Sequence, residues 1–157
     1  MKLILKLTII ITLVLLVSAC GKTDKKEAVI KTKEKVEAKD HNINNDWIHD
    51  IQLDNGLKWL ANIETTQGVD KMLNILKEDQ SKTVVDYHNL ADKLNVVKNK
   101  LVKECTMTGP PHDNLHIFLH PLIDKISHLQ KVSTIQDGLE ATQNIKENLD
   151  AYTKYFK

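Results

Sequence analysis

Residues 82–103, KTVVDYHNLADKLNVVKNKLVK, decide the fold class of this chain. Apolar side chains recur there at alternating spacings of three and four residues, at Tyr87, Leu90, Leu94, Val97 and Leu101. A period near 3.5 places these side chains on one side of an α-helix. The stretch therefore predicts an amphipathic helix that packs against other helices.

The same spacing recurs on both sides of this stretch. It predicts one helix over about 65–78, another over about 111–132, and a last one that opens at Ser133, where Gln136 completes a capping-box pattern. The links between the helices are short, which makes sequential helices antiparallel. Since no long apolar–polar alternation occurs, we predict an all-α, up-down bundle of about four helices.

An irregular segment, residues 47–66, precedes these helices. It holds both tryptophans, Trp47 and Trp59, and a turn signal at residues 54–56, Asp-Asn-Gly. We expect an arm or short hairpin that lies across the bundle and is anchored by the two indole rings. Residues 47–157 are therefore predicted to form one helical-bundle domain.

The N-terminus has the pattern of a secretory signal peptide over residues 1–19. Two lysines precede a short apolar run that ends in Val17-Ser18-Ala19-Cys20. This ending resembles the lipobox of bacterial lipoproteins, which implies cleavage before Cys20 and a lipid on its sulfur. The resemblance implies a cell-envelope protein that is anchored in the lipid bilayer and faces the periplasm or the exterior. The alternative is an uncleaved anchor helix, although the run is shorter than the roughly 20 residues that span a membrane.

Between the anchor and the bundle, residues 20–46 are rich in Lys, Glu and Asp and contain no aromatic residue. This composition cannot bury a core, so we predict a flexible, charged stalk. The whole chain has 22 basic residues, all of them Lys, and 21 acidic residues. A nearly neutral chain lacks the basic stripe of a nucleic-acid-binding protein, so no nucleic-acid partner is expected.

Metal-binding side chains gather in residues 105–121, CTMTGPPHDNLHIFLHP. Sulfur donors stand at Cys105 and Met107, and imidazoles stand at His112, His116 and His120. Thiolate and thioether suit Cu(I), whereas imidazole suits zinc and copper. The five residues are the candidate ligands of a metal ion, copper in the first place and zinc in the second.

Helical geometry limits how these residues can share an ion. The histidines are four residues apart, so they lie along one side of the helix, but His112 and His120 are roughly 12 Å apart along its axis. One ion can therefore take an adjacent pair, and His112–His116 lies beside the loop that carries the sulfur donors. At about 100° per residue the three side chains drift from the edge of the apolar face toward solvent. His120 is expected to be an outer or entry residue.

Structural roles explain the same residues without a ligand. Cys105 can be a small buried hydrophobe and Met107 a gap filler, while the histidines can be polar residues at the core edge. Haem held between Met107 and a histidine is a third interpretation. No catalytic pattern is recognisable, because neither a glycine-rich phosphate loop nor the Glu-x-x-His pattern of di-iron bundles occurs.

Two stretches, LDNGLKWLANIETTQGVDKM (53–72) and ECTMTGPPHDNLHIFLHPL (104–122), resemble segments of small secreted bacterial helical proteins. The resemblance implies that both stretches belong to one fold, and it implies no activity and no site. The sequence thus predicts a lipid-anchored envelope protein that binds a metal ion without catalysis. The alternative is a structural or protein-interaction module that docks onto another envelope protein and has no ligand.

Overall fold

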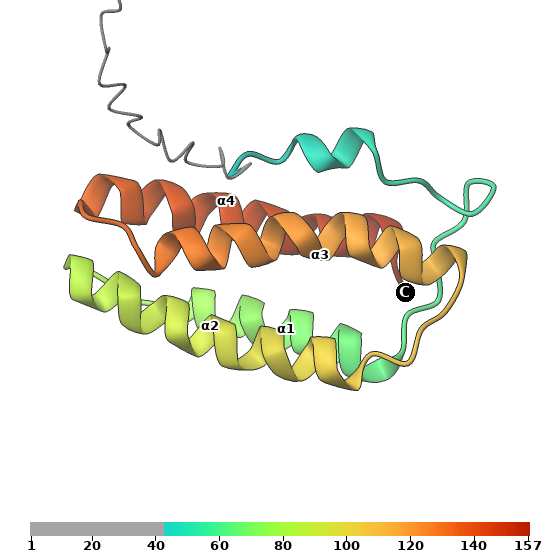
Figure 1. Ribbon diagram of the computed structural model, residues 1–157, viewed down its shortest axis with the longest axis horizontal. Helices are drawn as coiled ribbons and strands as arrows, with labels where there is room; N and C mark the ends of the chain where they lie inside the picture. Colours follow the sequence, from blue (N-terminus) through green and yellow to red (C-terminus); the bar gives the residue numbers. More distant parts are fainter. Residues whose placement is uncertain (1–42) are drawn as a thin grey trace, which may run out of the picture. The chain divides into compact units, whose positions relative to one another are not determined.

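The computed structural model describes residues 43–157; the predicted signal peptide, Cys20 and the stalk as far as residue 42 lie outside the described residues. The all-α prediction is confirmed, since four helices pack as an up-down bundle after an irregular arm (Figure 1). The helices are α1 (Ile63–Lys77), α2 (Val84–Glu104), α3 (Pro110–Leu129) and α4 (Ile135–Tyr155). α1 packs on α2 and α3 packs on α4, and further contacts of α2 with α3 and of α1 with α4 complete the bundle.

Side-chain caps place the starts of α2 and α4. The hydroxyl of Thr83 accepts a hydrogen bond from the Asp86 amide, and the Asp86 carboxylate accepts one from the Thr83 amide, so α2 begins with a full capping box. The prediction of Ser133 as the cap of α4 is wrong by one residue. Thr134 is the N-cap, and its hydroxyl accepts from the amide of Asp137 at 3.0 Å.

The arm contains the 3₁₀ helix η1 (Asp46–His49) and a tight turn before α1. Trp47 is 3% exposed and lies edge-on to Phe118, with 5.6 Å between the ring centroids. Trp59 is half-buried, and its indole N–H donates to the Gln52 carbonyl at 2.7 Å. The backbone of Trp59 also accepts from and donates to the last residues of the chain. Because Trp47 is buried in the core and the Trp59 side chain packs against it, both indoles anchor the arm, as predicted.

The interior is aliphatic along most of its length and aromatic where the arm meets α3 and α4. The side chains of this aromatic cluster are Trp47, Phe118, Tyr152, Tyr155 and Phe156. α4 also lies very close to α2 at Gly138. A Cβ added at this glycine would be only 2.3 Å from the ring of Tyr87. Only glycine allows the backbone of α4 to approach this ring so closely.

Candidate metal site

His112, His116 and His120 lie between the first turn and the middle of α3, and the start of that helix is strongly determined. Gly109 adopts a positive φ of 65°, and Pro110 and Pro111 take the first two helical positions, where a backbone N–H would be unused. The amide of His112 then donates to the Gly109 carbonyl at 2.9 Å. His112 therefore sits in the first turn of α3, beside the loop from α2.

The imidazoles of His112 and His116 are brought together. Their Nε2 atoms are 3.1 Å apart and their ring centroids are 4.4 Å apart. In the absence of an ion this is a hydrogen bond in which one ring donates, so at least one of the rings is neutral. A pair of imidazoles four residues apart on a helix is the arrangement that chelates an ion in helical metal motifs.

His120 continues the row. Its ring centroid is 5.0 Å from that of His116. His112 is half-buried, whereas His116 and His120 are exposed. The exposure follows the outward drift that the helical geometry predicted.

Electrostatics favour the neutral form of His116. The pKa of His116 lies below its usual value, first because of partial desolvation and then because a positive charge on His112 or His120 would repel a proton there. Asp113 acts weakly in the opposite direction. Neutral imidazole is the form that binds a metal, so the lowered pKa of His116 favours an ion there.

The two sulfur donors lie on the core side of the loop between α2 and α3. Cys105 ends α2 as its C-cap, and both Cys105 and Met107 are half-buried and pack against the hydrophobic core. Within residues 43–157, no three side chains of the types His, Cys, Asp and Glu lie close enough together to hold one ion. The structure therefore brings two predicted imidazole ligands together and does not add the Cys105 thiol to them. An ion on the pair would complete its coordination with water or with donors from elsewhere.

A polar cluster around Lys125 was not predicted. Lys125 is fully buried, and its ammonium donates to Asn45 Oδ1 and to Asn148 Oδ1, both at 2.6 Å. Asn45 Oδ1 also accepts from the indole of Trp47 at 3.1 Å. Burial lowers the pKa of Lys125 to about 8 against the opposing effects of Glu147 and Asp124. The cluster ties the arm to α3 and α4. The sequence carries one sign of this burial: Lys125 comes three residues after Leu122 and four before Leu129, so it lies on the apolar face of α3.

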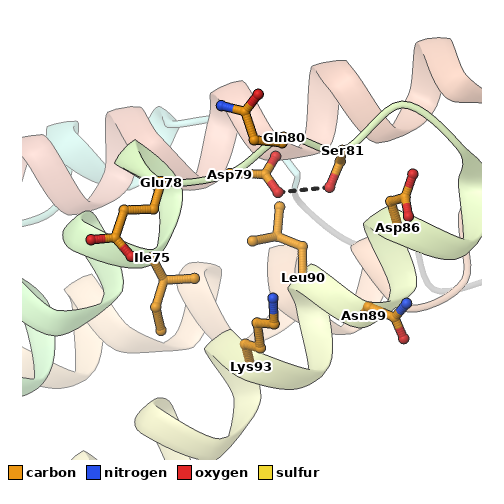
Figure 2. A pocket seen from close by; sticks show the side chains of 9 residues that line it. All are labelled: Ile75, Glu78, Asp79, Gln80, Ser81, Asp86, Asn89, Leu90 and Lys93. Carbon is orange, nitrogen blue, oxygen red and sulfur yellow. Dashed lines mark hydrogen bonds between the residues drawn. The ribbon is translucent and has the colours of Figure 1, made fainter.

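The far end of the bundle has a hollow of about 370 Å³ at the turn between α1 and α2 (Figure 2). Its charged lining residues are Glu78, Asp79, Asp86 and Lys93. Asp86 is engaged in the capping box, and Asp79 accepts from the Ser81 hydroxyl at 2.7 Å. Two of the three carboxylates thus hold the turn itself, and we assign no ligand to this hollow.

No family model, no curated protein and no solved structure matches this chain. Across the part of the chain that the structure describes, none of the helices has the length and apolar character needed to cross a bilayer.

Proposed function

We propose that this protein is a lipid-anchored lipoprotein of the cell envelope whose helical bundle binds a transition-metal ion without catalysis, copper in the first place and zinc in the second. His112 and His116 are the primary ligands, and His120 is the outer residue. Cys105 and Met107 are sulfur donors of the neighbouring loop that can reach a Cu(I) ion only if that loop moves. The anchor is Cys20, through the lipobox pattern.

The observation that carries the proposal is the 3.1 Å separation of the two Nε2 atoms. With ion–nitrogen distances of about 2.0–2.1 Å, this separation corresponds to an angle of roughly 98° at the ion. That angle lies between the values of about 90° for tetragonal and about 109° for tetrahedral coordination, which Cu(II) and zinc adopt with imidazole ligands. The pair is thus spaced for one ion before any ion is bound.

The test is a titration of the full chain, purified without a histidine tag in detergent, with Cu(II), Zn(II) and, under reducing conditions, Cu(I). Competition with a chromophoric chelator measures the affinity, and we expect about one equivalent of ion to bind. His116→Ala should abolish binding, whereas His49→Ala, which removes an exposed histidine of the arm, is the matched control. If the unmodified chain binds none of the three ions, the metal-binding proposal is wrong.

Cys105→Ala and Met107→Ala separate the two kinds of donor. Because both side chains pack against the core, we expect them to leave Cu(II) and zinc binding unchanged. A loss of Cu(I) binding alone would show that the loop rearranges to bring sulfur to the imidazole pair.

A second candidate, an interaction module of the envelope, is favoured by exposed apolar side chains at the end of the arm and the start of α1. Leu57, Leu60 and Ile63 are 64%, 72% and 65% exposed. Leu60→Asp would weaken the capture of an envelope protein by crosslinking if this surface is the functional one, while metal binding would stay unchanged.

A further inference from the structure

The three histidines form a row, and they do not form a three-ligand cluster. Neighbouring ring centroids are 4.4 Å apart for His112–His116 and 5.0 Å apart for His116–His120. The ends of the row are roughly 12 Å apart along the helix axis, which is far more than one ion can span. No group of three candidate ligands for one ion occurs in residues 43–157. Every chelating pair in the row therefore contains His116.

On the basis of the proposed metal-binding function, we infer that His116 is shared by two overlapping bidentate sites, His112–His116 and His116–His120, between which a divalent copper or zinc ion moves. The two sites exclude each other, because a single imidazole nitrogen of His116 holds one ion at a time. The row consequently takes one ion in two positions.

The exposure of the side chains gives the row a direction. His120 and His116 are exposed, so an ion from solution or from another protein meets this pair first. His112 is half-buried beside the loop from α2, and the Nε2 atoms of His112 and His116 are already at chelating distance. His116–His120 is thus the entry position, and His112–His116 is the resting position.

The step between the positions is a ligand exchange that needs no redox partner. The bond from the ion to the His120 imidazole breaks as a bond to Nε2 of His112 forms, and the bond to His116 persists. Water fills the remaining coordination positions before and after the step. The oxidation state of the ion and the number of protons on the imidazoles stay the same.

The test compares single variants for affinity and for the position of the ion. His112→Ala should still bind one equivalent, about tenfold more weakly, because the entry pair remains. His49→Ala, which removes an exposed histidine outside the row, should match the unmodified chain, and His116→Ala should lose at least roughly 100-fold in affinity because both pairs are broken. The double variant His112→Ala/His120→Ala should bind as poorly as His116→Ala.

The position of the ion is read from NMR spectra of the imidazole protons, which Cu(II) broadens when it is bound nearby. In the unmodified chain we expect broadening centred on His112 and His116, and in His112→Ala we expect it to move to His116 and His120. If His112→Ala loses binding as completely as His116→Ala, there is one site and the inference is wrong. If removing His120 has no effect in the His112→Ala chain, His120 is a solvated surface residue. Neither outcome affects the proposed function, which fails only if the unmodified chain binds no ion.

Discussion

The buried ammonium of Lys125 gives the sharpest prediction about stability. The side chain is fully buried, and its pKa is lowered from 10.5 to about 8 by desolvation. In the unfolded chain Lys125 recovers its ordinary pKa, so between about pH 8 and pH 10.5 the unfolded state binds more protons than the folded state. Stability therefore rises with pH in this window. The charges that face the ammonium are those of Glu147 from α4 and Asp124 from α3, and they reduce the shift without reversing it.

The two pKa values give a magnitude. Linkage between pH 7 and pH 10 yields a gain of about 2.5 kcal/mol in the free energy of unfolding for this one group. A buried Tyr has the opposite effect above its ordinary pKa of 10, since burial raises the pKa of both Tyr87 and Tyr152 in the fold. The scan should therefore stop at pH 10.

The assay is urea unfolding, followed by circular dichroism at pH 7, 8, 9 and 10, of the unmodified chain and of Lys125→Met. Methionine has a similar length and no charge, so Lys125→Met lacks the pH-dependent gain. Between pH 7 and pH 10, the unfolding free energy of the unmodified chain should therefore rise by about 2.5 kcal/mol relative to that of Lys125→Met. Subtraction removes the contribution of other groups, including Lys98, whose pKa is also lowered by desolvation. Lys146→Met, on the exposed side of α4, is the control for the loss of a lysine at the surface. If the Lys125→Met difference is also constant within about 0.5 kcal/mol, Lys125 is not a charged, desolvated group in the folded protein.

Three further substitutions test the fold by the same unfolding assay. Thr134→Ala should cost about 1 kcal/mol because it removes the cap of α4, whereas Ser133→Ala should change little, and the reverse order would contradict the observed cap. Gly138→Ala should cost about 1–3 kcal/mol because the added methyl overlaps the ring of Tyr87, and Tyr87→Leu in the same chain should recover part of that loss. Trp47→Ala should cost about 3–5 kcal/mol, since it leaves a cavity where the buried indole anchors the arm. A near-neutral result would show that Trp47 does not hold the arm on the bundle.

The helices were predictable because their signal is local. Spacings of three and four identify the buried side of α2 within a single stretch, and short links fix the antiparallel order. The ends were predicted less well, because a cap depends on the backbone angles of one residue. Ser133 and Thr134 are both hydroxyl residues, and only the structure shows that Thr134 has the extended backbone of an N-cap.

The polar cluster around Lys125, which the sequence did not predict, joins elements that are distant in the chain. The arm and α4 meet at Lys125 through Asn45 and Asn148, residues that are 103 positions apart in the numbering. A lysine on an apolar face can also extend its ammonium to solvent, so its position alone did not predict burial. The imidazole pair was predictable because four-residue spacing on one helix is local. Whether Cys105 joins it depends on the loop between two helices, which periodicity does not describe.

The two unusual polar features of α3 lie on opposite sides of that helix. Nine residues separate His116 from Lys125, which is a rotation of about 180° and a rise of roughly 13 Å. Lys125 lies in the interior, where its hydrogen bonds to neutral amides tie the arm to α3 and α4. His116 faces solvent, where an ion can enter and leave without disturbing the core. Since sites this far apart contribute independently, a loss of metal binding in His116→Ala with unchanged unfolding would be an effect on the site and not on the fold.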